Sequence, residues 1–306
     1  MQNCHTYLDL ATNLMRNQEI HTDDSEAQPD HLSAVSSTRP ELQALQFFSS
    51  LLISNDILSS SVHKTPPSST TGNLYHRLLS SPTFAHAVQS ATGCQAWILL
   101  RIMDATSLEK WKAEQERQGN LSVRELVKRA AELEAAVEDG IKTLSGLLQH
   151  STHDTTTSSN SADGWSDAAQ TNIFAHALLT HIHTIVSGAL SGVPEIRQSI
   201  DRTIRVWESP SPSPSWTRPR PMLRSLAWPY CVSASLASGA QRDVFRELAS
   251  SDLPSSALGL GIGGVFDYKA VVDACWREAD GMRSEREVPV DWRDTLMCLN
   301  TSFLFL

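Results

Sequence analysis

The chain has 306 residues, of which 41% are apolar and 19% are charged, and its formal net charge is −9. Such a length and composition are those of a globular protein with a large core. An acidic chain without a long Lys/Arg run is not expected to hold nucleic acid by itself, because phosphate binding is driven by Lys and Arg.

The cysteines and the N-terminus bear on the compartment. There are five cysteines, scattered and without a C-x-x-C pair: Cys4, Cys94, Cys231, Cys275 and Cys298. This usage favours a reducing compartment over a secreted disulfide scaffold. The first residues lack the basic start and apolar stretch of a signal peptide, and no apolar run approaches the ~20 residues that span a bilayer. We therefore expect no membrane association.

Composition divides the chain into two parts. Residues 1–40 are rich in Asp, Ser and His with weak periodicity, and they are predicted to be disordered. Residues 41–306 are predicted to form one helical domain. Polar, low-complexity linkers are expected inside it near residues 59–72, 150–164, 208–221 and 254–266.

The first helices are predicted from apolar residues at helical spacing. These are Leu42, Leu45, Phe48 and Leu52, followed by Phe84, Val88, Ala91, Ile98 and Ile102. Ser107 precedes a short helical turn that carries Leu108 and Trp111.

A long amphipathic helix is predicted over residues 122–149. Ser122 and Glu125 form a capping box at its start. Its apolar stripe steps by three or four residues through Leu126, Ala130, Leu133, Val137, Ile141 and Leu144. The charged residues lie on the other face.

The second half of the chain continues the helical pattern. A helix with Ile173 to Ala189 ends near Gly192, and Pro194 opens the next one. The stretch 226–248 begins with a Trp-Pro step, and its residues up to Ala237 are apolar on nearly every side, so this helix is expected at the centre of the core. Two more helices follow, with Tyr268 to Trp276 and with Trp292 after a capping Asp291. Strand alternation is nearly absent, so the predicted fold class is all-α.

Three groups of residues are weighed as sites, and in each case a structural role is favoured. His176 and His183 share a helical face, but His181 does not, and no carboxylate completes a zinc set. Gly259, Gly261, Gly263 and Gly264 resemble a dinucleotide loop but follow no convincing strand. Cys94 lacks an activating base and has apolar neighbours, which indicates burial.

No enzyme motif is present: there is no G-x-S-x-G, no Walker A loop and no H-E-x-x-H. The tryptophans beside the predicted helices are interpreted as core anchors. We predict no catalytic, cofactor-binding or metal-binding residues, and we do not expect an enzyme.

Three ordered segments resemble a known family. They are Thr92 to Glu134, then Leu226 to Leu248 with Trp228, Pro229, Ala237 and Arg242, then Trp276-Arg277-Glu278 followed by Asp291-Trp292 and Phe303-Leu304. In this order they resemble the fungal-specific transcription factor domain of zinc-cluster regulators, of the acriflavine-sensitivity-control type. The resemblance covers residues 40–306 in interrupted pieces.

The resemblance implies an all-α regulatory domain that acts in the nucleus on RNA polymerase II genes, such as those of a metabolic pathway. The family's DNA-binding module needs six cysteines, and residues 1–40 hold only Cys4, so no zinc ligand is carried over. The chain is therefore expected to have lost its zinc cluster or to be a truncated gene product. DNA binding is expected only if such a module lies upstream.

The implied partners are the transcription machinery or full-length family members, and a homodimer is possible. Two alternatives stay open. A Trp-rich core could line the pocket of a small-molecule-binding or enzymatic protein of a metabolic gene cluster. The long helix 122–149 could instead be the surface of an interaction module that restrains a full-length family member.

Overall fold

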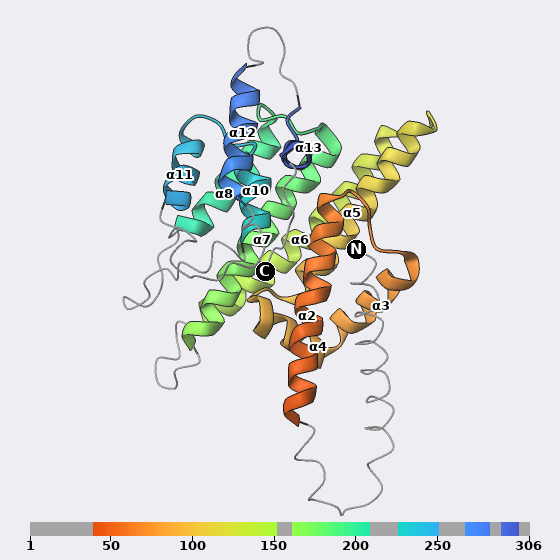
Figure 1. The fold of residues 1–306 in the computed structure, drawn as a ribbon, viewed down its shortest axis with the longest axis vertical. Helices are drawn as coiled ribbons and strands as arrows, with labels where there is room; N and C mark the ends of the chain where they lie inside the picture. Colours follow the sequence, from red (N-terminus) through yellow and green to blue (C-terminus); the bar gives the residue numbers. More distant parts are fainter. Residues whose placement is uncertain (1–38, 152–160, 209–225, 251–266, 282–288, 300–306) are drawn as a thin grey trace, which may run out of the picture.

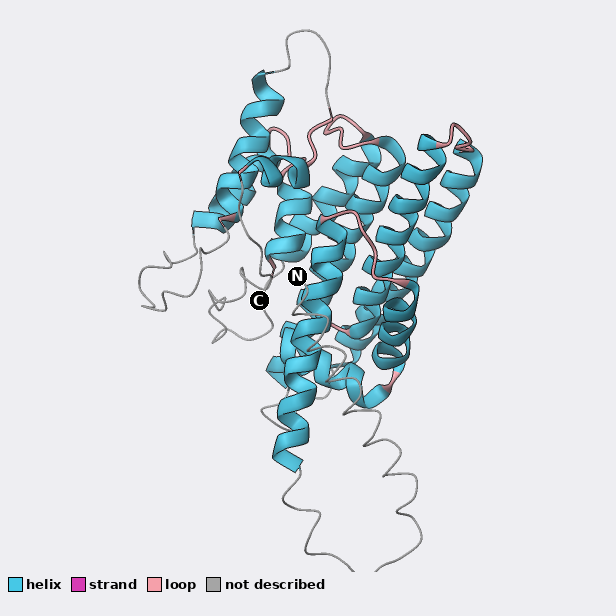
Figure 2. Ribbon diagram, turned by 45° about the vertical axis from the view of Figure 1, so that its right-hand side comes forward, coloured by secondary structure: helices cyan, strands magenta, loops and turns pink. Residues whose placement is uncertain are grey.

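The computed structural model describes residues 39–151, 161–208, 226–250, 267–281 and 289–299, with side chains from residue 43 to 146 and from 168 onward in these ranges. Helices account for the regular structure of these ranges and no strand occurs in them, which confirms the all-α prediction (Figures 1 and 2). The helices are α2 (Arg39–Val62), α3 (Ser69–Ser80), α4 (Pro82–Thr92), α5 (Ala96–Arg117), α6 (Val123–Ser151), α7 (Ser161–Ser187), α8 (Pro194–Glu208), α10 (Ala227–Ala234), α11 (Ala240–Ser250), α12 (Tyr268–Gly281) and α13 (Trp292–Cys298).

Helix α7 lies at the centre of the bundle and contacts α5, α6, α8 and α10. Every residue from Ala168 to His181 is buried except Ala169 and Asn172, which are partly exposed. A helix that is buried on nearly all sides lies inside the core. The expected central helix, α10, is also buried over its whole length, so the core has two central helices.

The N-terminal helices pack on one another, with α2 against α4 and α5. The predicted linker over residues 59–72 is wrong at both ends, because α2 continues to Val62 and α3 begins at Ser69. The serines fit inside α2 because their hydroxyls bond to the helix's own backbone: the Ser61 hydroxyl donates to the Leu58 carbonyl at 2.8 Å. Composition alone had suggested a loop.

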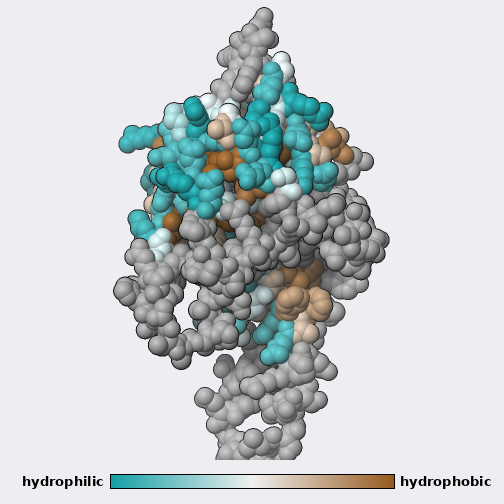
Figure 3. Space-filling view, turned by 90° about the vertical axis from the view of Figure 1, so that its left-hand side faces the viewer, coloured by the Kyte–Doolittle hydropathy of each residue, from teal (hydrophilic) through white to brown (hydrophobic). Residues whose placement is uncertain are grey.

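Part of the apolar stripe of α2 faces solvent. Phe48 is 62% exposed and Phe47 is 43% exposed, whereas Ile53 and Ile57 further along the helix are buried. The helix is confirmed, but its first turns extend beyond the body (Figure 1). Figure 3 shows a mainly hydrophilic upper surface on one side of the molecule and a separate apolar area lower down.

Helices α5 and α6 run side by side as a hairpin (Figures 1 and 2). The short turn expected after Ser107 is part of the continuous helix α5, because the Ser107 hydroxyl donates to the Met103 carbonyl and does not cap a new helix. The predicted cap of α6 is confirmed, since the Ser122 hydroxyl accepts from the Glu125 N–H at 3.3 Å. The Glu125 carboxylate accepts from Arg129 instead of closing the box.

Gly140 allows α5 and α6 to approach. A Cβ at Gly140 would stand 2.5 Å from the Trp97 ring, whereas a Cβ at Gly146, on the same helix, would meet nothing within 4 Å. We expect Gly140→Ala to destabilise the chain by about 1–3 kcal/mol through overpacking, despite its better helix propensity. Gly146→Ala should be neutral or stabilise by up to about 1 kcal/mol. Urea unfolding of the two variants checks this pair, and equal effects would contradict the packing role of Gly140.

The later helices can be compared with the predicted helix starts and linkers where the residues are described. Pro194 opens α8 and Pro229 lies in the first turn of α10, both as expected. The predicted linker 150–164 is too long, because α6 ends at Ser151 and α7 begins at Ser161. The predicted linkers over 208–221 and 254–266 lie outside the described residues, apart from Glu208, which ends α8. The expected disordered segment 1–40 lies outside as well, apart from the first residues of α2.

The length and hydropathy of the helices also bear on membranes. Among the described helices, none has a stretch long and apolar enough to cross a bilayer.

Candidate functional site

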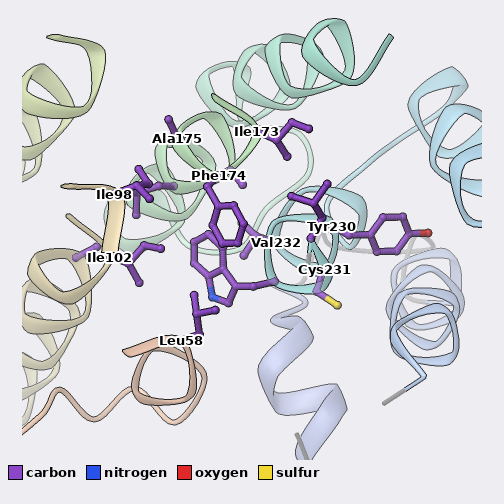
Figure 4. Close-up of a cluster of buried hydrophobic side chains, with 14 of the residues drawn as sticks. Leu58, Ile98, Ile102, Ile173, Phe174, Ala175, Tyr230, Cys231 and Val232 are labelled. Atoms are coloured by element: carbon purple, nitrogen blue, oxygen red, sulfur yellow. The ribbon is translucent and has the colours of Figure 1, made fainter. Parts of the chain in front are cut away.

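Trp228, which carried part of the family resemblance, lies in the core. Trp228 of α10 is 1% exposed and stacks on Phe174 of α7, with ring centroids 5.9 Å apart and planes 4° from parallel. Its indole N–H donates to the Ser61 hydroxyl at 2.8 Å. Figure 4 shows Phe174 between Ile98 and Ile102 on one side and Val232 on the other. The Trp-Pro step therefore joins α10 to α2 and α7.

Arg242 of the second segment and Trp276 of the third connect α10, α11 and α12. The Trp276 indole N–H donates to the Ala234 carbonyl at 2.7 Å, at the end of α10. Arg242 donates to the Ala237 carbonyl at 2.9 Å and to Asp280 at 2.8 Å, and its guanidinium lies over the Trp276 ring. A planar guanidinium can make these fork-like and stacked contacts at once, which an ammonium cannot.

Asp291 of the third segment belongs to an ionic cluster, here called the Arg293 cluster: Lys64, Glu109, Asp291 and Arg293. Arg293 is 5% exposed. Its two terminal nitrogens each lie 2.7 Å from a Glu109 oxygen on α5, and one also lies 2.7 Å from Asp291. The other donates to the Ser61 carbonyl at 3.1 Å, and Lys64 lies 2.9 Å from Asp291.

Asp291 has a second role in this cluster. It is the N-cap of α13, as expected, and accepts from the Arg293 N–H at 3.0 Å. The cluster thus ties α13 to α2 and α5, across 232 and 184 residues of sequence. Ser61 links the Arg293 cluster to the Trp228 contact, since its hydroxyl accepts from the Trp228 indole and its carbonyl accepts from Arg293.

Electrostatics in the Arg293 cluster favour the charged carboxylates. Burial raises the pKa of Glu109 and Asp291, but hydrogen bonds from Arg293 and its charge outweigh burial, so both pKa values lie below their usual range. The pKa of Arg293 is raised, because the hydrogen bonds to Asp291 and Glu109 outweigh its desolvation. The cluster is charged at neutral pH.

His181 borders the cluster without joining it. Its Nε2 lies 3.9 Å from Glu109, too far for a hydrogen bond, and has no hydrogen-bond partner. Burial, followed by the charge of Arg293, lowers the pKa of His181 to about 4. At pH 7 it is therefore neutral, and the hydrogen bonds from Arg293 are the largest of the effects that lower the pKa of Glu109. Its ring meets Trp228 edge-on.

The buried histidines should make the chain acid-sensitive. Burial also lowers the pKa of His176 to about 4, with a further contribution from Arg202. Histidines of an unfolded chain take up protons near pH 6.5, so the unfolded state binds more protons as the pH falls from about 6.5 to 4. We expect His176 and His181 each to lower the free energy of unfolding by up to about 1.4 kcal/mol for each unit that the pH falls within this window.

Urea unfolding at pH 7, 6 and 5 checks this expectation. His181→Leu should flatten the dependence of the unfolding free energy on pH, while His86→Gln, at an exposed position of α4, should leave it unchanged. An unaltered slope in His181→Leu would contradict the neutral, buried state of His181.

The three histidines weighed as zinc ligands do not converge. His181 faces α5 and α13, whereas His183 faces α6 and α8, as their helical positions predicted. The structure does bring a carboxylate near each of these two, Glu109 and Glu134, which the sequence did not reveal. No group of three or more potential ligands arises among the described residues.

One arrangement approaches catalytic geometry. Ser199 Oγ lies 3.0 Å from His183 Nδ1, and His183 Nε2 lies 3.2 Å from Glu134 Oε1. A nucleophile must reach its substrate. Ser199 is 2% exposed in the middle of α8 and its hydroxyl also bonds the Glu195 carbonyl at 2.9 Å. The order Ser–His–Glu here serves helix packing.

Of the other residues weighed as sites in the sequence, Cys94 and the tryptophans Trp228 and Trp276 lie in the core. Cys94 is 3% exposed, as predicted. Burial raises the pKa of Cys231 and Cys275, so both are thiols at neutral pH. The glycines 259, 261, 263 and 264 lie outside the described residues. Trp228 and Trp276 donate to protein acceptors in the core, which is the role of anchors.

Known proteins resemble the whole chain. The fungal specific transcription factor domain matches residues 1–306. The ustiloxin B cluster transcription factor ustR of Aspergillus flavus is 34% identical over 87% of this chain and 43% of its own length. Transcription factor phomR of Diaporthe leptostromiformis is 34% identical over 100% of this chain and 50% of its own length.

A further relative is the trichothecene biosynthesis transcription regulator TRI10 of Trichoderma arundinaceum, 27% identical over 83% of this chain and 52% of its own length. The chain thus spans about half the length of these curated relatives. No solved structure matches it. The family match over residues 1–306 and the 34% identity to ustR and phomR confirm the resemblance that the three segments indicated. The chain belongs to the fungal-specific transcription factor domain family.

Proposed function

We propose that the chain regulates transcription of a biosynthetic gene cluster, as the helical regulatory domain of a nuclear factor. The observation that carries this proposal is the similarity over its whole length to proteins named as transcription factors, three of them for ustiloxin B or trichothecene biosynthesis. The geometry supports a regulatory body over an enzyme, because the buried polar contacts around Trp228, Trp276 and Arg293 connect helices to one another. The transcription machinery is the proposed partner.

A fusion experiment tests this function. The full chain, joined to a heterologous DNA-binding module, should change transcription of a reporter with matching upstream sites in a filamentous fungus. Trp228→Ala should abolish that change, because it disrupts the core described above. In the host organism, deletion of the gene should lower or raise the transcripts of a contiguous set of biosynthetic genes. Unchanged reporter and cluster transcripts would overturn the proposal.

DNA binding and localisation are separate parts of the proposal. The purified chain should show no sequence-selective DNA binding at physiological salt, since its charge is −9. A fluorescently tagged full-length protein should accumulate in the nucleus. Tight, sequence-selective binding by this chain alone would contradict the division between a DNA-binding module and a regulatory body.

A second candidate function, restraint of another family member by pairing, is favoured by the solvent face of α6. Val123 and Val127, one turn apart, are 66% and 48% exposed. The exposed charges are basic at Arg124, Lys128 and Arg129 near the start of the helix, and further along they are acidic at Glu132 and Asp139 with one basic residue, Lys142. Two such helices packed antiparallel would set basic residues against acidic ones, so the proposed partner is a second chain of this family.

Light scattering after gel filtration tests the pairing. A chain that pairs through α6 should be dimeric at tens of micromolar, and Val127→Gln should shift it to monomer. Met297→Gln, at a 60% exposed apolar position of α13, is the matched control and should not. Monomeric wild-type chain at this concentration would count against an interaction module.

A further inference from the structure

The first turns of α2 present an uncharged apolar surface to solvent. Phe48 is 62% exposed and Phe47 is 43% exposed, and their rings meet edge-on with centroids 5.7 Å apart. Residues 43–55 contain no charged residue, although the solvent-exposed sides of helices usually carry charges. A surface of this kind is suited to an apolar partner.

The described body leaves Phe48 uncovered. Helix α2 packs on α4 and α5, and its buried residues Ser50, Ile53 and Ile57 lie at helical positions roughly opposite Phe48. Phe48 therefore points away from the core. A partner that covers it must come from outside the described residues.

The segment before α2 contains a sequence that fits this surface. Residues 7–17 lie outside the described residues, but on a helix of 3.6 residues per turn their apolar side chains would share an arc of about 160°. These side chains are Tyr7, Leu8, Leu10, Ala11, Leu14 and Met15. The polar residues Asp9, Asn13 and Arg16 fall on the opposite side. Unlike the Asp- and Ser-rich residues that follow, this stretch is typical of an amphipathic helix.

The connection to α2 brings this stretch within reach of Phe48. Residues 18–38 join it to Arg39, where α2 begins, and Phe48 lies about 14 Å further along the helix axis. A random coil of these 21 residues has an end-to-end distance of about 25 Å, which is sufficient. Such a tether gives an effective concentration on the order of millimolar, and a second copy of the chain would have to be that concentrated to compete.

We propose that residues 7–17 pack as an amphipathic helix on Phe47 and Phe48 of the same chain. The apolar face with Leu10 and Leu14 covers the two rings, and the polar face with Arg16 meets solvent. Because the contact forms within one chain, it holds the N-terminal segment beside the start of α2 at any protein concentration.

Trypsin provides a test because the N-terminal segment offers one cleavage point. Arg16 is the sole Lys or Arg before Arg39, and trypsin does not cut after Arg39 because proline follows. In the full native chain, Phe48→Gln should speed cleavage after Arg16 about five- to tenfold, since proteolysis follows the population of the released segment. Leu10→Gln should do the same, and the double variant should add little to either change. Met297→Gln, at a 60% exposed apolar position of α13, is the matched control and should leave the rate unchanged.

Photo-cross-linking identifies the occupant directly. With p-benzoylphenylalanine in place of Phe48, irradiation of the full chain should join position 48 to residues 7–17 in a species of monomer mass, and mass spectrometry locates the bond. The same amino acid in place of Met297 should not reach those residues. Cross-links from position 48 to a second chain or only to other residues would overturn the proposal, as would equal cleavage rates in wild type and Phe48→Gln.

Discussion

Replacing Arg293 with methionine should destabilise the chain by about 3–5 kcal/mol, the cost of breaking a buried ion pair from one side. Methionine keeps the volume of the aliphatic stem, but it leaves Glu109 without its cation and Asp291 with Lys64 alone, although both carboxylate side chains are only 16% exposed. The Ser61 carbonyl loses a donor as well. The measurement is the free energy of unfolding in urea at pH 7, and the matched control is Arg277→Met at an exposed position of α12, expected within about 0.5 kcal/mol of wild type.

The pH dependence of the unfolding free energy shows whether charge or packing causes the loss of stability in Arg293→Met. Glu109 and Asp291 have folded pKa values below their unfolded ones, so their contribution is complete above about pH 5 and is lost as the pH falls through the folded values. The stability gap between wild type and Arg293→Met should therefore narrow between about pH 5 and pH 3. Adding Glu109→Gln to Arg293→Met should restore part of the loss. A gap that is constant with pH would show that packing, and not charge, is what Arg293 supplies.

Features that depend on contacts between residues close in the sequence could be predicted, and features that depend on distant residues could not. Helical periodicity is local, so it correctly predicted α6 with its Ser122 cap, α8 after Pro194 and α13 after Asp291. It failed over 59–72, where serines that bond to their own helix have the same composition as a loop. Sequence spacing also could not show that the first turns of α2 would leave Phe48 in solvent.

The site was harder to predict because its partners are distant in the chain. Trp228 lay in a segment with a family resemblance, and Arg293 directly follows the Asp291-Trp292 pair of another. Glu109 lay in the first such segment, within a turn expected to be short, and Ser61 lay in a supposed linker. Nothing local distinguishes Glu109 from the exposed Glu116 on the same helix. A buried arginine close to a motif is the signal that could have prompted a search for its carboxylate, since charges are seldom buried unpaired.

Replacing Trp228 with alanine should cost about 3–5 kcal/mol, comparable to the loss of any large core aromatic. The side chain is 1% exposed, stacks on Phe174 and touches His181 edge-on, so its removal leaves a cavity among α2, α7 and α10. Trp228→Phe keeps an aromatic ring and removes the N–H together with part of the volume, and a loss of about 1–3 kcal/mol is expected. Thermal or urea unfolding measures both variants.

Substitution of Ser61 shows whether Trp228 stabilises the fold mainly through its hydrogen bond or through its volume. Ser61→Ala leaves the buried indole N–H without its acceptor, which should cost about 1–3 kcal/mol. The half-buried neighbour Ser60 provides the control, and Ser60→Ala should be close to neutral. In Trp228→Phe the donor is gone, so adding Ser61→Ala should cost much less than it does in wild type. If the two losses simply add, the indole N–H and Ser61 act independently, and the Trp-Pro motif stabilises the fold through its volume alone.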